Sequence, residues 1–526
     1  MIKTDLVLPY GYNHDSVKDA ICGHLPISKN EIKEIRILKR ELIVRDGANP
    51  VYKTTVAFSS DVDKEQGLLK IRNRVSSYDE EIFTPETASF KKRPIVAGAG
   101  PAGLFAALTL AESGGSPIVI ERGLEVGERR KRIDTFSTLG ILDTECNIQF
   151  GEGGAGTYSD GKLKTGAKDK YKLKVLYEFI AGGADESIAY STSAHLGTDK
   201  LPDIVKKIRE RIISLGGEFI FSAKLTDLIV KDTVLSAIKY EKDGEETVLE
   251  TDTLILAIGH SARDTVRMLK AKGLTMKAKG FGIGMRIEHP REYINEIVYR
   301  DAASVIEESA SYHLVTHLPS GRSVYSFCMC PGGQVVAATS ENDAIVTNGM
   351  SEYARMADNS NAALLVSVTP EDFGSDDPLA GIGLQTEIER AAYRATGSYK
   401  APSISLSSLL GGKTEVASDV KPSYPIGVVD VPPGEYFPDY IPMSIAAAMP
   451  DFDKWMPGYS YAGAVLTGPE TRTTSPVRIE RDATGCAPDF YGIYPTGEGA
   501  GYAGGIISSA VDGIKMAEKA IEKHLK

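Results

Sequence analysis

The stretch RPIVAGAGPAGL (residues 93–104), followed by SPIVIER (residues 116–122), decides the fold of this chain. The apolar run at residues 94–97 predicts a short strand, and the G-x-G-x-x-G pattern after it predicts a tight turn. The next apolar stretch, residues 104–111, predicts a helix, and Glu121 ends the strand that follows. A strand, a glycine turn, a helix, a second strand and an acidic residue together predict a Rossmann-like unit that binds a dinucleotide.

The residue types in this unit suit that ligand. Gly98 permits the turn out of the strand, Gly100 lets the backbone approach a pyrophosphate, and Gly103 lets helix and strand pack closely. Free amides at the helix start face the phosphates. Glu121 fits a carboxylate that accepts the hydroxyls of an adenosine ribose and would repel a 2′-phosphate, so the pattern favours FAD or NAD over NADP.

Length and composition agree with a globular enzyme. A chain of 526 residues has room for about three domains at ~150 residues each. No apolar run reaches the ~20 residues that span a bilayer, and residues 1–15 lack the basic start and apolar core of a signal peptide. We therefore expect a cytoplasmic protein with no membrane partner.

Charge and cysteine content narrow the partners further. A net charge of −11 disfavours broad binding to a phosphate backbone, so we expect a small-molecule substrate rather than nucleic acid. Five cysteines, an odd number, indicate reduced thiols rather than a disulfide framework. The histidines show no metal-ligand spacing, so we expect no metal site. The sequence leaves the oligomeric state open.

Residues 1–88 precede the dinucleotide unit and predict a small module of their own. Alternating apolar residues at 2–8, a helical stretch near 15–25 and strand candidates at 32–44 and 51–58 are typical of a ferredoxin-like α+β fold. The module either packs against the rest of the protein or recruits a protein or RNA partner, and the sequence favours packing.

Two later segments predict further contacts with a dinucleotide. Four glycines at positions 151–156 predict a loop whose backbone passes close to a ligand, with Asp160 and Lys162 directly after it. Downstream we expect a helix over residues 200–215, capped by Thr198 or Asp199. Strand candidates follow at 218–221, 224–230, 234–240 and 247–260, and the last of these reads as one long strand that stops at Gly259.

The C-terminal segment predicts a second helix start aimed at the cofactor. A strand near residues 491–495 leads to Glu498 in a glycine turn, and a helix begins at residues 504–506. Small residues, among them Gly513, let this helix pack tightly. The amides at its start suit the negative charge of a reduced flavin.

Motifs spread over nearly the whole chain resemble the large two-dinucleotide-binding-type superfamily of FAD flavoproteins. More narrowly, the chain is similar to bacterial FAD-dependent proteins labelled NAD/FAD-utilising dehydrogenases. The motifs that carry the narrower resemblance are FGEGGAGTYSDGKL (150–163), CMCPGG (328–333), TRTTSPVRI (471–479) and GEGAGYAGGI (497–506). The resemblance implies an α/β protein whose Rossmann-like FAD-binding domain is discontinuous, formed by residues 89–279 and 475–526. A mixed α+β substrate domain is inserted at residues 280–474.

The resemblance also implies which residues hold FAD. Gly98, Gly100, Pro101, Ala102 and Gly103 would hold the pyrophosphate and Glu121 the ribose. Arg122 and the backbone of Leu225 would lie by the adenine, with Arg129 and Gly259 toward the phosphates. The flavin side would be formed by Gly154, Ala155, Lys162, Gly505 and Ile506, with Glu498 at the ribityl or phosphate contact.

Two residues of the insertion are candidates for chemistry on a substrate. Cys328 and Cys330 lie two apart, and we interpret Cys330 as a thiol near the flavin that exchanges electrons or attacks a substrate. The alternative makes both cysteines small buried hydrophobic residues. Arg472 could clamp an anionic substrate, or form an interdomain ion pair.

These patterns predict an FAD-dependent oxidoreductase, a dehydrogenase or reductase that moves a hydride through flavin N5. The substrate is a small molecule that the sequence does not identify. With one complete dinucleotide fingerprint, NADH or NADPH would visit the site only transiently. The competing hypothesis is an FAD-binding redox sensor or scaffold whose N-terminal module recruits a protein or RNA partner.

Overall fold

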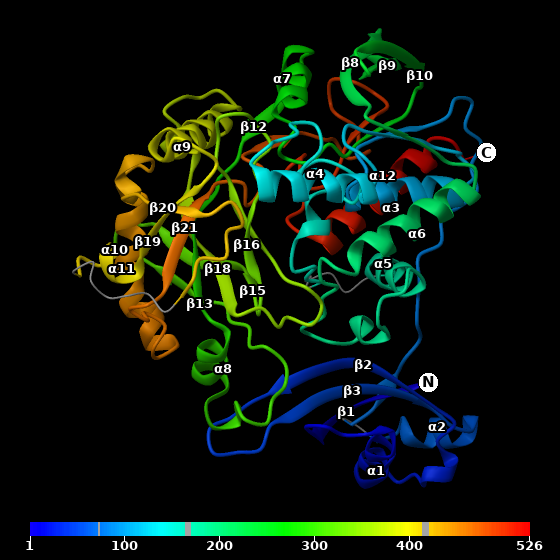
Figure 1. Ribbon diagram of the computed structural model, residues 1–526. Helices are drawn as coiled ribbons and strands as arrows, with labels where there is room; N and C mark the ends of the chain where they lie inside the picture. Colours follow the sequence, from blue (N-terminus) through cyan, green and yellow to red (C-terminus); the bar gives the residue numbers. More distant parts are fainter. Residues whose placement is uncertain (72–73, 164–169, 413–419, 526) are drawn as a thin grey trace.

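The computed structural model describes residues 1–71, 74–163, 170–412 and 420–525. Figure 1 shows three parts: a helix-rich part around α3 and α12, a sheet-rich part around β13 and β18, and a small module formed by the first strands and helices. Within the described ranges no helix is long and apolar enough to cross a membrane.

A five-stranded parallel sheet forms the centre of the helix-rich part, in the order β23-β11-β5-β6-β7. Its strands are β5 (Ile95–Ala97), β6 (Ile118–Glu121), β7 (Glu218–Phe221), β11 (Leu254–Leu256) and β23 (Ile493–Pro495). Strand β23, far along the chain, forms the edge beside β11, and β7 forms the opposite edge beside β6. Strands before and after the long insertion belong to one sheet.

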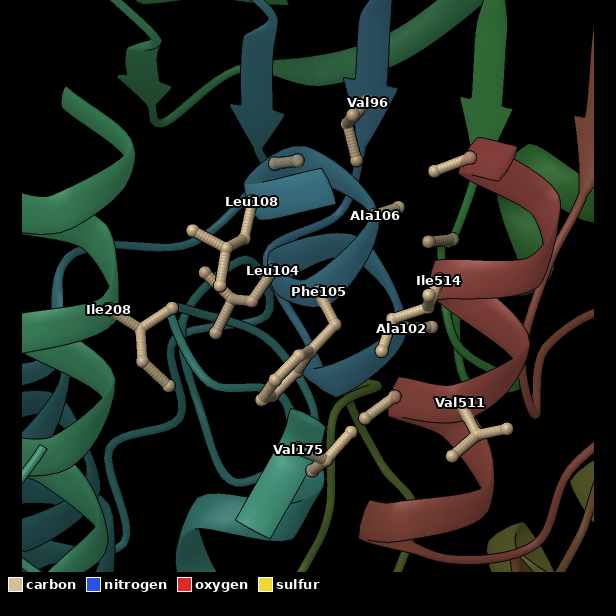
Figure 2. Close-up of a cluster of buried hydrophobic side chains, with 14 of the residues drawn as sticks. Val96, Ala102, Leu104, Phe105, Ala106, Leu108, Val175, Ile208, Val511 and Ile514 are labelled. Carbon is tan, nitrogen blue, oxygen red and sulfur yellow. The ribbon is translucent and has the colours of Figure 1, made fainter. Parts of the chain in front are cut away.

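The helices on this sheet pack through small residues. They are α3 (Pro101–Glu112), α4 (Val126–Leu139), α5 (Lys170–Ala181), α6 (Leu201–Ser214), α7 (Arg263–Ala271) and α12 (Ile506–Glu522). In Figure 2, α3 lies between α12 on one side and Ile208 of α6 on the other. A Cβ atom on Gly513 of α12 would lie 2.1 Å from the carbonyl oxygen of Ala102, so this contact requires glycine. The predicted small face of α12 is confirmed here.

Two predictions in this part were wrong in detail. The predicted strand over residues 247–260 is divided into β10 (Glu245–Glu250) and β11, because the Thr251 hydroxyl accepts a hydrogen bond from the Thr253 amide and turns the chain. The predicted caps of α6 serve other contacts. The Thr198 hydroxyl donates to the carbonyl of Thr157, and the Asp199 carboxylate accepts the amide of Tyr353.

The other elements near this sheet form smaller sheets. Strands β8 (Lys224–Lys231), β9 (Val234–Lys242) and β10 make a three-stranded antiparallel sheet. Short pairs are formed by β12 (Met276–Ala278) with β22 (Val477–Ile479) and by β16 (Gln334–Ala337) with β17 (Thr347–Met350).

The insertion is built on a seven-stranded mixed sheet in the order β14-β15-β18-β13-β21-β19-β20. These strands are β13 (Phe281–Pro290), β14 (Val315–His317), β15 (Ser323–Cys330), β18 (Asn359–Val368), β19 (Ala401–Ser405), β20 (Val428–Asp430) and β21 (Val465–Glu470). The accompanying helices are α8 (Arg291–Tyr299), α9 (Ala380–Thr396), α10 (Leu406–Leu409) and α11 (Tyr440–Trp455). The central strands β13 and β18 are almost entirely buried, and their side chains form the core of this part.

The N-terminal module has the element order β-α-β-β-α-β, which is the ferredoxin-like order. Its elements are β1 (Ile2–Pro9), α1 (His14–His24), β2 (Glu34–Ile43), β3 (Val51–Ser59), α2 (Val62–Leu68) and β4 (Ser76–Ser77), with sheet order β2-β3-β1-β4. The module is bound to both other parts. The Arg40 amide donates to the Tyr190 carbonyl at 2.7 Å, and the hydroxyls of Tyr10 and Tyr52 donate to Glu308 at 2.6 and 3.0 Å.

Candidate functional site

A cavity of about 390 Å³ lies between the five-stranded sheet and the insertion. It meets the carboxyl ends of the parallel strands, which is where ligands bind in open α/β sheets. Most of the sequence-predicted cofactor residues line it. These are Gly98, Gly100, Pro101, Ala102, Glu121, Arg122, Gly154, Ala155, Lys162, Leu225, Gly259, Glu498, Gly505 and Ile506.

The glycine turn forms one wall and explains two of its glycines. Gly98 has φ +103°, and a Cβ there would lie 2.3 Å from the carbonyl oxygen of Ala257, so no side chain fits. Gly103 does not line the cavity, which corrects its assignment to the pyrophosphate. A Cβ on Gly103 would lie 1.8 Å from the carbonyl oxygen of Gly98, and the glycine is needed for packing of α3 against the turn.

Glu121 stands at the end of β6 with only 5% of its surface exposed. Its carboxylate accepts three backbone amides, from Ala99 at 2.8 Å and from Gly123 and Gly151 at 2.9 Å. One side chain therefore joins the glycine turn to the loop that begins at Gly151. A carboxylate has about four lone-pair positions, so one remains for a ribose hydroxyl on the cavity side.

Arg122, the residue after Glu121, also lines the cavity. Its guanidinium donates to Glu145 at 2.9 Å and to both oxygens of Asp264 at 2.9 and 3.0 Å, and it lies 4.0 Å from the centre of the Phe150 ring. These pairings hold the pKa of Arg122 above its usual range, against the effect of burial. The guanidinium is thus fixed as a flat wall beside Leu225, which suits an adenine.

Arg129 is not a phosphate ligand in this structure, contrary to the prediction. Its side chain is fully buried and is not part of the cavity wall. The guanidinium donates instead to loop carbonyls, including those of Ile148 at 2.8 Å, Glu152 at 2.7 Å and Gly154 at 2.9 Å. Arg129 therefore holds the glycine loop in shape from behind.

The glycine loop itself closes against both helix starts. A Cβ on Gly154 would lie 3.0 Å from the Cα of Gly100, and one on Gly156 would lie 3.0 Å from the side chain of Ile506. Lys162, after the loop, lines the cavity, and its ammonium donates to the carbonyl of Met329. The loop thus connects the glycine turn, the start of α12 and the insertion.

Glu498 and His260 form a polar pair on the cavity wall. Their side chains meet at 2.9 Å through His260 Nδ1, and His260 is 10% exposed. His260 Nε2 is buried and has no hydrogen-bond partner among the described residues. A buried nitrogen without a partner is costly unless a ligand satisfies it, and a phosphate or ribityl oxygen of FAD would do so. The residues present therefore fit FAD.

The cysteine assignment needs correction. Cys330 is fully buried and does not line the cavity, whereas Cys328 is half-buried and does. The strand is irregular here, because the register of β15 against β18 shifts between Phe327 and Cys330. The thiol that faces the cavity is that of Cys328.

Arg472 lines the cavity, but it is not free to clamp a substrate. Its guanidinium donates to both carboxylate oxygens of Glu389, at 3.0 and 2.8 Å, and to the Ser340 hydroxyl at 2.5 Å. Arg263 donates to the same carboxylate at 2.8 and 2.9 Å. The substrate clamp is therefore replaced by a buried ion-pair network. Arg263 and Arg472 hold the pKa of Glu389 well below its usual range, although burial acts in the opposite direction.

His260, Asn348 and Glu470 are among the cavity residues that had not been assigned from the sequence. His260 directly follows the buried strand β11, and the position after a parallel strand was a usable signal. Asn348 and Glu470 reach the cavity from β17 and β21 of the insertion, and no local pattern marks them. Burial raises the pKa of Glu470 to about 7, against the effect of Arg286, which donates to it at 2.6 and 3.0 Å.

Among the residues that the structure describes, no group of three or more His, Cys, Asp or Glu side chains is placed to hold a metal ion.

Comparisons with known proteins relate the chain to FAD-dependent proteins. A family model described as "FAD-dependent protein, C-terminal domain-like" matches residues 280–473. A protein of Clostridium beijerinckii, described as an uncharacterized protein, is 45% identical over 514 residues, which cover 96% of this chain and 95% of that protein.

Solved structures show more distant likeness. The flavin-dependent brominase Bmp2 has a TM-score of 0.38 at 11% identity, over 82% of this chain and 78% of that one. A geranylgeranyl bacteriochlorophyll reductase-like protein from Thermoplasma acidophilum has a TM-score of 0.35 at 12% identity, over 83% and 79% of the two chains. Likeness at this level carries no argument about activity.

Proposed function

We propose that this chain, which belongs to a family of FAD-dependent proteins, is an oxidoreductase that transfers a hydride between a small molecule and flavin N5. FAD is its cofactor. The observation that carries the proposal is a single cavity. Cys328, Asn348 and Glu470 of the insertion share it with the glycine turn and with Glu121.

Bound FAD supplies reversible acceptance of a hydride. The chain supplies position and charge. Glu121, the glycine turn and the start of α12 hold the dinucleotide, and the loop held by Arg129 covers it against water. The exposed amides at the start of α12 favour negative charge on the reduced flavin.

Glu470 is the group that we assign to proton transfer at its carboxylate oxygens. It lies on the cavity wall with 2% of its surface exposed, and its pKa of about 7 lets it accept or release a proton near neutral pH. Hydride removal from an alcohol or amine releases such a proton, so an acceptor of this kind is required.

The proposal includes NADH or NADPH as a transient partner. Either nucleotide would enter the cavity that FAD occupies, and would leave it again after the transfer. The test is anaerobic stopped-flow mixing of the FAD-loaded protein with NADH, NADPH and a set of small metabolites, followed by flavin absorbance. The expected result is bleaching of the flavin band by at least one compound, with Glu470→Gln slowing the step. If no compound bleaches the flavin, the redox-sensor hypothesis replaces the enzyme.

A further inference from the structure

Two thiols lie close together in sequence at the end of β15, one in the cavity wall and one buried behind it, and the proposed hydride transfer does not use them. Cys328 is half-buried and lines the cavity, and Cys330 is fully buried next to it. The structure describes five cysteines, all free, and these two are the pair that lies close together in the sequence.

The backbone brings the two thiols together. In a regular strand, residues two apart are separated by roughly 6.6 Å along the chain. Here Cys328 has φ +42°, and the ladder between β15 and β18 is interrupted at this point. As a result, the Cys330 thiol donates to the carbonyl oxygen of Cys328, with its Sγ 3.2 Å from that oxygen.

Charges around the pair favour one thiolate and one thiol. Arg286 Nη1 donates to the Cys328 carbonyl at 3.1 Å and reaches Cys330 Sγ at 3.8 Å, and the ammonium of Lys162 is held at the carbonyl of Met329 between the two cysteines. Asp160 and Glu470 are the carboxylates that face the same group and oppose this effect.

The pKa values of the two thiols are shifted in opposite directions. The neighbouring Cys330 side chain, with Arg286 and Lys162, holds the pKa of Cys328 below its usual range in spite of burial and Asp160. The neighbouring Cys328 side chain and burial raise the pKa of Cys330. An accessible thiolate beside a buried thiol is the division between attacking and resolving cysteines in redox pairs.

We propose that Cys328 and Cys330 form a dithiol/disulfide couple that exchanges electrons with FAD in this cavity. In the oxidising direction the S–H bond of Cys330 breaks and a bond forms between the two sulfur atoms. The two electrons and the proton pass to oxidised FAD, which becomes the reduced anion, so charge and hydrogen balance. This inference rests on the proposed function in one respect, which is that FAD accepts the electrons.

The first test is chemical and needs no turnover. Trypsin releases residues 323–355 as one peptide that contains both cysteines and no others, because Arg322 and Arg355 bound a stretch without Lys or Arg. Diamide, which oxidises thiol pairs to disulfides, is added to the full-length protein before digestion. Mass spectrometry should then find that the mass of this peptide is lower by two hydrogen atoms and that its cysteines resist alkylation. Cys330→Ser and Cys330→Ala should abolish that product, and Cys486→Ser, at a buried cysteine elsewhere, should leave it.

Iodoacetamide labelling of the reduced protein at pH 6 tests the thiolate. An ordinary thiol with pKa ~8.5 is under about 1% ionised at this pH, so Cys328 should label at least about tenfold faster than the half-buried Cys22 of α1. Equal rates at the two sites would contradict an activated Cys328.

The second test counts electrons. Anaerobic dithionite titration of the diamide-oxidised, FAD-loaded protein should consume one more two-electron equivalent per flavin in the wild type than in Cys330→Ser. The proposed couple is overturned if the wild type and Cys330→Ser consume equal amounts of dithionite. It is also overturned if peptide 323–355 with an internal disulfide is not found. The peptide and labelling results stand without any reduction of flavin by a metabolite, so their outcome is separate from that of the proposed function.

Discussion

At the scale of single residues, one side chain can serve the fold and the site together. Glu121 accepts three backbone amides and borders the cavity, so its carboxylate fixes the distance between the glycine turn and the glycine loop. The sequence predicted its place at the strand end but not these amide partners, because they come from loops whose course depends on tertiary packing.

Glu121→Ala should therefore reduce FAD retention and stability together. Each buried amide left without an acceptor costs about 1–3 kcal/mol, and the ribose loses its carboxylate. The measurement is the flavin-to-protein absorbance ratio after gel filtration, with the urea midpoint. Glu128→Ala, at a half-exposed position on α4, is the control and should change neither. A normal flavin ratio in Glu121→Ala would remove this residue from the cofactor site.

His289 gives a prediction for pH. It lies fully buried in β13, its Nε2 meets the Tyr459 carbonyl at 2.9 Å, and burial lowers its pKa to about 4. Because the folded state binds the proton more weakly than the unfolded chain, stability is complete above about pH 6.5 and falls as the pH is lowered toward 4.

The loss attributable to His289 should be on the order of 3 kcal/mol across that range. Urea unfolding of the wild type and of His289→Gln at pH 7 and pH 4.5 measures it. The difference in free energy of unfolding between the two proteins should shrink at the lower pH. A pH-independent difference would show that folding does not lower the pKa of His289.

The errors in the predicted site also belong to this scale. Arg129 and Arg472 were assigned from motif position, and the sequence does not show that loop carbonyls and Glu389 occupy their guanidinium groups. Cys330 was preferred to Cys328 because it directly precedes Pro331 and a glycine pair, and the sequence does not show the shift in register between Phe327 and Cys330 that changes which side chain faces the cavity.

At the scale of elements, the close packing of α3 and α12 joins the two ends of the cofactor domain. The contact depends on Gly513, where a side chain would meet the backbone of α3 at Ala102. The starts of both helices line the cavity, so a displacement of one helix changes the cofactor site.

Gly513→Ala should destabilise the protein by about 1–3 kcal/mol, because the added methyl group overfills the contact. FAD retention should fall with it. Gly383→Ala in α9 is a matched control, since a Cβ there meets nothing within 4 Å, and alanine there should be neutral or slightly stabilising. The measurement is the melting temperature of both variants in thermal unfolding. Equal melting temperatures for Gly513→Ala and Gly383→Ala would show that α12 can shift without cost.

Local elements of the dinucleotide unit were predictable, and the sheets were not. Strand β5, helix α3 and strand β6 follow from short-range pattern, and the glycine turn fixes their order. The neighbours of β13 in the seven-stranded sheet come from residues 359–368 and 465–470, and such distant pairing leaves no signal in a local window.

At the scale of the whole molecule, buried charge ties the insertion to the cofactor domain. Arg263 of α7 is 1% exposed and donates to Glu389 and Gln385 of α9. An exposed pair, Lys270 with Asp377, joins the same two parts at 2.6 Å. The two links differ in burial and can be compared directly.

Arg263→Met should cost about 3–5 kcal/mol, because it leaves part of the buried charge of Glu389 without a partner. Lys270→Met should cost less than ~1 kcal/mol, because water screens the exposed pair. Chemical denaturation followed by flavin fluorescence and circular dichroism would measure both. Similar losses in the two variants would contradict a special role for the buried network.

The threading of the central sheet has a consequence for biosynthesis. Strand β23, helix α12 and the turn between them are translated after the other elements described here, yet they supply an edge of that sheet, a cover for the apolar α3, and the cavity wall at Glu498 and Ile506. Until these elements have been synthesised, FAD has no complete cavity in which to bind. A chain that ends before residue 493 would therefore leave the apolar helix α3 uncovered, and we expect such a fragment to be prone to aggregation.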